Sequence, residues 1–420
     1  MNKLNTIFEA LEKSNFNVST DTRKNLSDSV FFALRGENFD GNEFVHLALE
    51  KGAALAVTDN PKNVGKNIVL VPDVLKMLQT IAREYRKKFA IPIIVIGGSN
   101  GKTTSKDLIR DVLKTKYKVH STEGSLNNHF GVPLSILAMP RNTEIGVFEI
   151  GANHPLEHTE LLNILAPTHV IVTNNGMDHL EGFGSPIGAR MANKELYDWA
   201  SAHSGAAFVN KNHADLMIDS KENTRILYPN KNLEVAKNEF LTVLWNEKEY
   251  KTNLVGNYNI ENMELALAVG KKFGVEIPDA LITICKYVPL SKRSQFITKN
   301  NIHFIVDCYN ANPTSMQLSL QSFVDSAKNP KGVILGDMLE LGEYADAEHI
   351  KMVGFVLKQK FDCIIFVGEK FKKALGNKNE KYYWFPDSES AKFWFLTQKF
   401  DGFTFLLKGS RGMKIEKILE

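Results

Sequence analysis

The stretch PIIVIGGSNGKTTSKDLI, residues 92–109, decides the fold, because it leads an apolar strand through glycines into a polar helix. Gly98 and Gly101 let the backbone turn sharply and bring its amides close to anionic oxygens. Lys102 supplies a positive charge for outer phosphates, and Thr103 offers a hydroxyl to Mg²⁺ at a helix N-terminus that favours anions. The stretch therefore predicts an ATP-binding loop between a buried strand and a helix.

The loop is a shortened form of the usual phosphate-binding pattern. That pattern has a glycine five places before Gly101, where this sequence has Ile96. The alternative is an ordinary glycine-rich turn with an exposed lysine, but Gly-Lys-Thr-Thr directly after a buried strand is uncommon in such turns. The residues predicted to bind ATP here are Gly98, Ser99, Asn100, Gly101, Lys102, Thr103 and Thr104.

The composition is that of a globular protein with two or three domains, since 420 residues exceed one ordinary core. The net charge is only +3 without a strongly basic stripe, which argues against nucleic acid as the main partner. No apolar run has the length of a signal core or a membrane span, so no membrane insertion is expected. Cys285, Cys308 and Cys363 have neither metal nor disulfide spacing, which favours buried thiols in a reducing cytoplasm. We expect a cytoplasmic monomer.

Three series of strand-like runs predict an α/β protein with three domains. Residues 1–83 alternate short apolar runs such as VFFAL and NIVLV with amphipathic stretches, and a helix is predicted over residues 73–89. Residues 84–290 contain buried runs such as IPIIVIGG and THVIVTN, which indicate a mostly parallel sheet around the phosphate loop. Residues 291–420 contain five strands, each followed by a helical stretch, namely IHFIVD, GVILGD, CIIFVG, YYWFP and FTFLLKG. This rhythm predicts a Rossmann-like doubly wound domain.

Polar side chains accompany two predicted strands of the central domain. Glu149 lies in VFEIGAN, and His179 ends IVTNNGMDH. A carboxylate and an imidazole beside a phosphate loop can complete the coordination of Mg²⁺, which needs few protein ligands besides phosphate and water. Taken singly, a strand-end surface charge and a hydrogen-bonding histidine explain these residues as well. Lys194, in ANKELYDW, has the pattern of a solvated lysine on an amphipathic helix.

The last apolar strand, FTFLL, runs into LKGSRG at residues 407–412. Lys408, Ser410 and Arg411 lie at the end of this strand, just before a helical stretch, which makes a natural receptor for a carboxylate. A basic surface turn explains the same three residues equally well.

Seven segments occur along the chain in an order that resembles the Mur ligase family: GSNGKTT, FEIGAN, NNGMDHLEGFGS, NKELYDW, GNYNIEN, DCYNANPTSM and GDMLELGE. This family contains the ATP-dependent amide-forming enzymes of peptidoglycan precursor synthesis. The resemblance covers nearly the whole chain and is strongest to the member that joins D-alanyl-D-alanine to UDP-N-acetylmuramoyl-tripeptide. It implies a UDP-binding N-terminal domain, where DTRKNLSDSVFFALRGENFDGNEF matches, followed by a central ATPase-type domain and a C-terminal ligase domain.

The resemblance also implies roles for individual residues. It makes ATP a substrate together with two Mg²⁺ ions, and it places Asn262 near the adenine. It gives Lys194 a carbamate, which would turn a cation into an anion that helps to hold the second ion. The implied catalytic residues are Lys102, His179, Lys194, Arg293 and Asp307. The implied metal ligands are Thr103, Glu149, His179 and Lys194. The expected substrate contacts are Thr22, Arg23, Asp40, Gly41, Asn127, Asn128, Asn310, Asn312, Lys408, Ser410 and Arg411.

Two positions that are adjacent in sequence to these implied site residues depart from the usual family pattern. Asn42 stands where a histidine often follows Asp40 and Gly41, and Lys292 precedes Arg293 where a glycine is common.

Two other interpretations stay open. One is another ligase of the same superfamily that adds diaminopimelate, lysine or glutamate. Its diaminopimelate-adding members carry Asn-Pro-Arg in the C-terminal domain, where this chain has Ala-Asn-Pro-Thr at residues 311–314. The other is a nucleotide-dependent binding or switch protein that forms no amide, and it would need the phosphate loop alone.

Overall fold

The computed structural model describes residues 3–36, 38–230, 233–236, 240–290, 292–376 and 381–420. The chain divides into two compact units. The first comprises Met1–Val95, Lys118–Ala152 and Glu157–His169, and the second comprises Ile96–Tyr117, Asn153–Leu156 and Val170–Glu420. The division falls within strand β7 (Ile93–Gly97), which leads into the phosphate loop.

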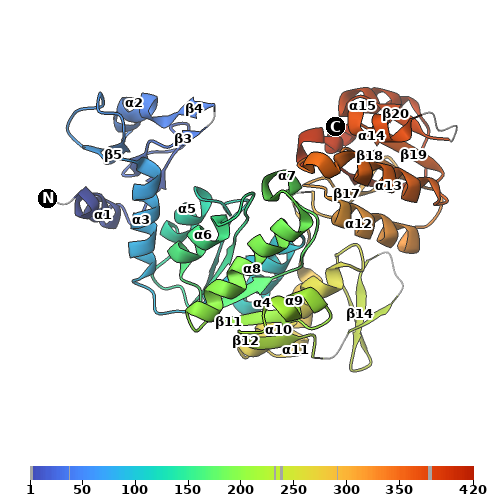
Figure 1. Cartoon of the computed structure of the whole chain (residues 1–420), viewed down its shortest axis with the longest axis horizontal. Coiled ribbons are helices and arrows are strands. Elements are labelled where there is room, and N and C mark those ends of the chain that lie inside the picture. Colours follow the sequence, from blue (N-terminus) through green and yellow to red (C-terminus); the bar gives the residue numbers. More distant parts are fainter. Residues whose placement is uncertain (1–2, 37, 231–232, 237–239, 291, 377–380) are drawn as a thin grey trace. The chain divides into compact units, whose positions relative to one another are not determined.

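The first unit begins with a small sheet of parallel strands in the order β1-β2-β5-β6. Figure 1 labels β5 of this sheet and the helices α1, α2 and α3 of the same unit. Its strands are β1 (Val18–Ser19), β2 (Val30–Phe32), β5 (Leu55–Thr58) and β6 (Ile68–Leu70), and its helices are α1 (Lys3–Lys13), α2 (Val45–Glu50) and α3 (Val74–Arg86). The antiparallel pair β3 (Arg35–Gly36) and β4 (Phe39–Asp40) precedes the 3₁₀ helix η1 (Gly41–Phe44). Asp73 caps α3 by accepting a hydrogen bond from the N–H of Lys76 (2.9 Å), which confirms the predicted helix.

The central sheet has six strands in the order β12-β11-β10-β7-β9-β8. In the first unit, β8 (Val119–Ser121) pairs in parallel with β9 (Ile145–Glu149), and α5 (Gly131–Leu137) and α6 (Glu157–Leu165) belong to the same unit. The remaining strands are β10 (His169–Val172), β11 (Ala206–Asn210) and β12 (Thr224–Tyr228), of which the last two pair in parallel. Strand β7 is buried along its whole length, as its run of isoleucine and valine predicts.

The helices that follow the central strands in the second unit are α4 (Lys102–Lys114), α7 (Leu180–Phe183), α8 (Pro186–Ala202), α9 (Ala214–Asp219), α10 (Asn259–Lys272) and α11 (Ile277–Lys286). This unit also contains a small antiparallel sheet of β13 (Glu234–Ala236), β14 (Thr242–Trp245) and β15 (Lys248–Lys251), which the sequence pattern does not predict. Asn246 and Glu247 form a two-residue hairpin turn with positive φ angles of 49° and 65°.

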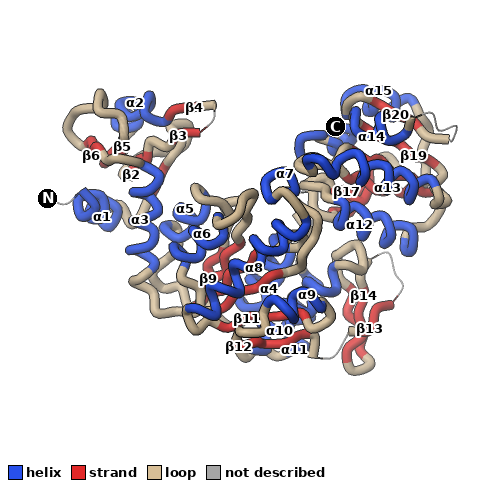
Figure 2. The backbone as a smooth tube through the Cα atoms, in the orientation of Figure 1, coloured by secondary structure: helices blue, strands red, loops and turns tan. Residues whose placement is uncertain are grey.

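The C-terminal sheet has the strand order β16-β17-β21-β18-β19-β20, and Figure 2 shows its strands among helices. The five predicted strands are present as β17 (Ile302–Asp307), β18 (Lys331–Gly336), β19 (Cys363–Val367), β20 (Tyr383–Phe385) and β21 (Thr404–Lys408). They run parallel, and β16 (Gln295–Lys299) adds an antiparallel edge. The helices are α12 (Pro313–Ser326), α13 (Ala345–Leu357), α14 (Glu369–Leu375) and α15 (Ser388–Thr397), with the 3₁₀ helices η2 (Gly342–Tyr344), η3 (Arg411–Met413) and η4 (Ile415–Leu419).

Apolar clusters cover both faces of the C-terminal sheet. On one face α12, α13 and α14 contribute Met316, Val353 and Phe371, and on the other α15 and η4 contribute Phe395 and Ile415. Helices on both faces of a mostly parallel sheet are the defining feature of a doubly wound domain, so the predicted α/β fold class is confirmed.

The predicted burial of the cysteines is confirmed at two of the three positions. Cys308 and Cys363 are buried, whereas Cys285 is only half-buried, and all three are free thiols. Burial raises the pKa of the Cys363 thiol to about 12, which makes it an inert core residue at neutral pH. Among the described residues, no helix has the length and apolar character that a bilayer span requires.

Candidate active site

The phosphate loop has the backbone geometry that its glycines predict. Gly98 and Gly101 adopt φ angles of 106° and 81°, in the left-handed region. A Cβ atom at Gly98 would lie 2.4 Å from Thr173 Oγ1, and one at Gly101 would lie 2.6 Å from Asn262 Oδ1. Neither position has space for a larger residue, because the loop packs directly against these two neighbours.

The loop is held in place by the segment that follows β10. The N–H of Ser99 donates to the Asn174 carbonyl (3.0 Å), and Ser99 Oγ donates to Asp178 Oδ1 (2.5 Å). The N–H of Asn100 donates to Asn174 Oδ1 (3.1 Å), and Asn174 Nδ2 donates back to the Asn100 carbonyl (3.1 Å). These bonds preorganise the loop before any ligand arrives, which lowers the entropic cost of binding.

Lys102 lies at the start of α4, folded over the loop. Its ammonium donates to the carbonyls of Gly98 (2.5 Å) and Ser99 (3.2 Å). The first backbone hydrogen bond of α4 runs from Ser105 N to Gly101 O (2.8 Å). The N–H groups of the first turn, which includes Thr103 and Thr104, therefore point toward the N-terminal end of the helix. An ammonium beside a helix N-terminus can receive the outer phosphates of a nucleotide.

Asn262 approaches the loop from α10. Its Oδ1 accepts from Ser105 Oγ (2.9 Å), and its Nδ2 donates to Asn259 Oδ1 (2.8 Å). Asn262 therefore supports the helix that follows the loop, while its predicted position beside the adenine stays a prediction.

Helix α8 packs on the same loop. Asn193 Nδ2 donates to Asn175 Oδ1 (3.0 Å) and lies 3.4 Å from Ser99 Oγ, and Leu196 lies 2.9 Å from the Cβ position of Gly97. The adjacent Lys194 forms an ion pair with Asp198, four residues later on the helix. A carbamate on Lys194 would be an anion and would repel that carboxylate, so modification would require Asp198 to turn away.

His179 is oriented by a carboxylate that sequence patterns do not single out. Its Nδ1 lies 2.7 Å from Glu340 Oε2, and the backbone carbonyl of Glu340 accepts from the N–H of Glu181 (3.1 Å). The hydrogen bond from His179 lowers the pKa of the Glu340 carboxyl. A histidine that donates from Nδ1 presents the lone pair of Nε2 to a metal ion, which is the usual arrangement of a carboxylate-oriented ligand. The available signal was the GDMLELGE segment, which contains Glu340.

Glu149 ends β9 in the first unit and is only 2% exposed. Its Oε1 accepts from Asn127 Nδ2 (2.9 Å), and the Asn127 carbonyl accepts from the N–H of Gly151 (2.8 Å). Asn128 has a different task, because its Oδ1 accepts from the N–H groups of Phe130 (3.1 Å) and Gly131 (2.9 Å) at the start of α5. The two asparagines thus connect the end of β9 to the start of α5 within the first unit.

The imidazole of His179 fits Mg²⁺ that is held largely by phosphate oxygens, because Glu340 orients the ring. The described part of the chain contains no group of three or more His, Cys, Asp or Glu side chains that could hold a metal ion. Magnesium bound with a nucleotide keeps water and phosphate ligands and needs only one or two protein groups. The oriented imidazole of His179 therefore suits a nucleotide-dependent metal site in the second unit better than a site formed by protein alone.

In the C-terminal sheet, Asp307 and Lys408 lie opposite each other on β17 and β21. Lys408 Nζ donates to Asp307 Oδ2 (2.5 Å), the Lys408 side chain is 2% exposed, and Asp307 Oδ1 accepts from the N–H of Ser294 (3.2 Å). Buried in this pair, Lys408 has a structural partner, and its role as a receptor for a substrate carboxylate stays a prediction.

Two predicted arginines converge on one aromatic ring. The guanidinium carbon of Arg293 lies 3.4 Å from the ring centroid of Tyr309, and that of Arg411 lies 5.5 Å from it. Stacking keeps both charges on one side of the domain, where they can attract a phosphate or a carboxylate. Tyr309 was not among the predicted site residues, although it belongs to the DCYNANPTSM segment.

The same segment contacts the phosphate loop. Asn312 caps α12 through a bond from the N–H of Ser315 (2.8 Å), and its Nδ2 donates to Asn100 Oδ1 (2.9 Å). Thr314 Oγ1 accepts from the N–H of Met177 (3.2 Å). Asn310 is exposed next to these residues. The segment thus links the start of α12 to the loop and to the residues before His179.

The hydroxyl group of Ser410 is occupied by hydrogen bonds within the protein. It is buried, its Oγ accepts from the N–H of Leu339 (2.8 Å), and it donates to the Ala311 carbonyl (3.2 Å). It therefore joins two loops at the carboxyl ends of the C-terminal strands.

The predicted uridine-binding residues lie in the first unit on two loops. Arg23 forms a two-point ion pair with Asp21, and the carbonyl of Thr22 accepts from Lys51 Nζ (2.9 Å). A Cβ atom at Gly41 would lie 2.5 Å from the Leu34 carbonyl oxygen, so only glycine fits there.

The hydrogen bonds of the Asn42 side chain explain why an asparagine occupies this position. Asn42 is buried, and its Nδ2 donates to Asp40 Oδ1 (2.7 Å) and Asp59 Oδ1 (2.9 Å). Its Oδ1 accepts from Thr58 Oγ1 (2.5 Å). The amide both donates and accepts without adding charge, and this network fixes Asp40 beside Gly41.

Three family models match the chain in sequence: the Mur ligase family catalytic domain over residues 17–86, the Mur ligase middle domain over 96–270 and the Mur ligase glutamate ligase domain over 292–411. The UDP-N-acetylmuramoyl-tripeptide--D-alanyl-D-alanine ligase of Bacillus subtilis (strain 168) is 32% identical, over 96% of this chain and 92% of its own length. The chain belongs to the Mur ligase family.

Solved structures of Mur ligases share the fold. A crystal structure of MurF from Acinetobacter baumannii has a TM-score of 0.87 and 26% identity, covering 98% of this chain and 97% of its own. The structure of MurF ligase from Thermotoga maritima in complex with ADP has a TM-score of 0.82 and 24% identity, covering 96% of each chain. The match over all three family domains confirms the three-domain α/β architecture expected of this Mur ligase.

Proposed function

We propose that this Mur ligase joins D-alanyl-D-alanine to UDP-N-acetylmuramoyl-tripeptide with the consumption of ATP, as the name of its Bacillus subtilis relative describes. The observation that carries the proposal is the similarity to that enzyme over 96% of the chain, combined with a preorganised phosphate loop. The name of that relative favours this substrate pair over diaminopimelate, lysine or glutamate. A nucleotide switch without ligase chemistry would not explain similarity that extends through the C-terminal ligase domain.

The first step would activate the terminal carboxylate of the tripeptide. A carboxylate oxygen attacks the γ-phosphorus of ATP, the bond from this phosphorus to the bridging oxygen breaks, and ADP leaves. The product is an acyl phosphate. Because carboxylate and triphosphate repel each other, the ammonium of Lys102 and the N-terminus of α4 would offset negative charge where they meet.

The second step would form the amide. The amine nitrogen of D-alanyl-D-alanine attacks the acyl carbon, the nitrogen loses a proton, and inorganic phosphate leaves from the tetrahedral intermediate. An acyl phosphate also reacts with water, so the site must exclude solvent during this step. Arg293 and Arg411, gathered around Tyr309, are suited to hold an anionic group of a substrate or intermediate.

The magnesium ligands in this proposal are Thr103, Glu149, His179 and Lys194. When bound, magnesium would neutralise phosphate charge and polarise the γ-phosphoryl group. Glu149 would supply a carboxylate oxygen, and Glu340 would hold the imidazole ring of His179 in one orientation.

The remaining assignments belong to the same proposal. Asn262 would lie near the adenine, and Asp307 near the nucleotide. The uridine part of the substrate would bind to residues Thr22, Arg23, Asp40 and Gly41, and the peptide parts to residues Asn127, Asn128, Asn310, Asn312, Lys408, Ser410 and Arg411. We also propose that the domains end at residues 83 and 290 and that the protein works as a monomer. A reducing cytoplasm is proposed as its location, and the three free cysteines support this.

Purified protein tests the function directly. ADP release should require ATP, a UDP-N-acetylmuramoyl-tripeptide and D-alanyl-D-alanine together, and mass spectrometry should find the pentapeptide product. Tripeptides ending in diaminopimelate and in lysine should both be assayed. Lys102→Ala should abolish ADP release while the circular dichroism spectrum is unchanged. Product formation with single amino acids but not with the dipeptide would reject the proposal.

A further inference from the structure

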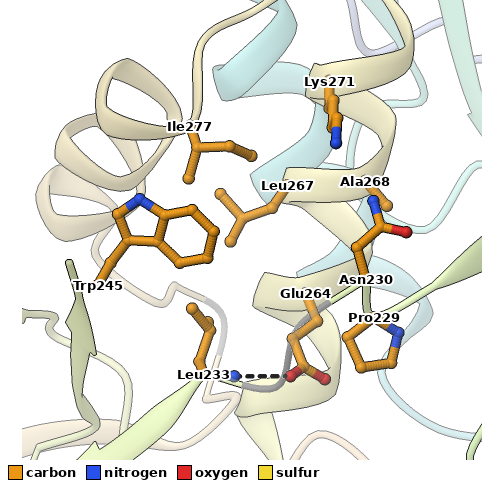
Figure 3. A pocket seen from close by; sticks show the side chains of 9 residues that line it. All are labelled: Pro229, Asn230, Leu233, Trp245, Glu264, Leu267, Ala268, Lys271 and Ile277. Atoms are coloured by element: carbon orange, nitrogen blue, oxygen red, sulfur yellow. Dashed lines mark hydrogen bonds between the residues drawn. The ribbon is translucent and has the colours of Figure 1, made fainter.

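A cavity of about 120 Å³ lies in the second unit between α10, the start of α11 and the small antiparallel sheet. Its walls are mostly apolar, and a carboxyl group and an ammonium also line it (Figure 3). The lining residues that matter here are Leu233, Trp245, Glu264, Leu267, Lys271 and Ile277. The ligase reaction proposed above assigns no role to any of them.

The cavity and the phosphate loop lie on opposite sides of α10. A helix turns by about 100° per residue, so Glu264, Leu267 and Lys271 project from the face opposite to Asn262. Asn262 faces Ser105 and the Cβ position of Gly101. A ligand in the cavity would therefore leave the nucleotide loop accessible.

Glu264 is a buried acid with unused bonding capacity. It is 7% exposed, and its Oε1 accepts from the N–H of Leu233 (3.3 Å). Its Oε2 has no hydrogen-bond partner within the described residues, and Figure 3 shows the carboxyl group at the cavity wall. Burial raises the pKa of Glu264, and the negative charge of Glu261 raises it further, whereas the N–H of Leu233 and the charge of Lys211 offset only part of this effect.

We propose that this cavity binds a small apolar monoamine, whose ammonium pairs with Glu264 and whose apolar group packs against Trp245 and Leu267. An apolar cavity of about 150 Å³ holds one benzene molecule, so this somewhat smaller cavity admits at most a single ring or a branched alkyl group. An indole face also attracts a cation. The ammonium of the exposed Lys271 also lines the wall, so a polyamine would meet more repulsion there than a monoamine does.

Benzylamine is the probe, titrated calorimetrically into protein saturated with a non-hydrolysable ATP analogue. Saturable binding is expected, and Glu264→Gln should weaken it by at least about tenfold, because a charged hydrogen bond is lost. Benzyl alcohol should bind wild type more weakly than benzylamine, and benzoate should not bind. Glu249→Gln, at an exposed acid of β15, is the matched control and should leave the affinity unchanged.

A second variant blocks the space and keeps the acid. Ala268 also lines the cavity, and Ala268→Leu should abolish benzylamine binding while Tm shows an intact fold. The proposal is overturned by absence of saturable binding, by equal affinity of wild type and Glu264→Gln, or by competition between benzylamine and the nucleotide. None of these results depends on ligase turnover, so they separate this proposal from the proposed function.

Discussion

At Gly98 the backbone has a φ of 106°, and a Cβ atom there would lie 2.4 Å from Thr173 Oγ1. Gly98→Ala should therefore displace the loop, lowering the free energy of unfolding by about 1–3 kcal/mol and nucleotide affinity by at least about tenfold. Calorimetric nucleotide binding and urea unfolding would measure both effects. Gly354→Ala is the control, because Gly354 lies within α13 with open space around its Cβ position. It should be neutral or stabilising, and an equal loss at both positions would contradict the steric argument.

We propose that Glu340 acts on the reaction through His179, since it lies 2.7 Å from the Nδ1 atom of that imidazole. Glu340→Gln should lower kcat by about ten- to a hundredfold, the usual cost of losing an orienting carboxylate. KM for the dipeptide should hardly change, because the side chain is not assigned to its binding. Glu343→Gln, an exposed acid in the next turn, should retain wild-type kcat. A loss confined to KM would reject the orienting role.

Among the elements, β17 and β21 are joined by the ion pair between the buried Lys408 and the partly exposed Asp307. Lys408→Met keeps the length of the side chain but removes the ammonium partner of the partly exposed Asp307 carboxylate, so the free energy of unfolding should fall by about 1–3 kcal/mol. Urea titration would measure this loss. Lys399→Met, at an exposed lysine, should change stability by less than about 0.5 kcal/mol. Unchanged stability of Lys408→Met, with lost dipeptide binding, would instead favour Lys408 as a carboxylate receptor.

A pH-dependent contact joins α9 and α10, where His213 Nε2 lies 3.1 Å from Glu261 Oε1. The hydrogen bond with Glu261 raises the pKa of His213. A histidine whose pKa is higher in the folded state than in the unfolded state stabilises the folded state at pH values below its unfolded pKa. This contribution disappears as the pH rises through the folded pKa. Because the pair is partly exposed, the loss between about pH 6 and pH 8 should not exceed about 1 kcal/mol. His213→Gln should remove this pH dependence, whereas the exposed control His46→Gln should retain it, as measured by unfolding at several pH values.

For the whole molecule, ligand binding should stabilise the two compact units unequally. The phosphate loop, α4 and α10 belong to the second unit. A nucleotide at about 100 times its Kd adds about 2.7 kcal/mol to the free energy of unfolding. Hydrogen exchange with an ATP analogue and Mg²⁺ should therefore slow chiefly in the phosphate loop, α4 and the segment after β10. Lys102→Ala should remove this protection, and protection confined to the N-terminal sheet would contradict the site.

Much of the architecture could be predicted because local patterns agree with the final fold. The strand before Gly98 is buried, the five C-terminal strands occur as expected, and the helix over residues 73–89 appears as α3. The β13–β15 sheet was missed because its strands are short and include many exposed positions, which weakens the alternation on which the prediction depends. The antiparallel edge strand β16 was missed for a similar reason, since only its pairing with β17 identifies it.

The sequence alone determined the chemistry of the loop, because glycine spacing, a lysine and a helix start are local features. It determined the family as well, because seven segments occur along the chain in an order that resembles the Mur ligases. Only the tertiary structure decided which distant side chains meet: Glu340 with His179, Asn312 with Asn100, and Lys408 with Asp307. These partners are separated by about a hundred residues or more, and a charge or amide at one position does not specify its partner. That choice is made by the order of strands in the sheets and by the burial that forces each polar group to find a complement.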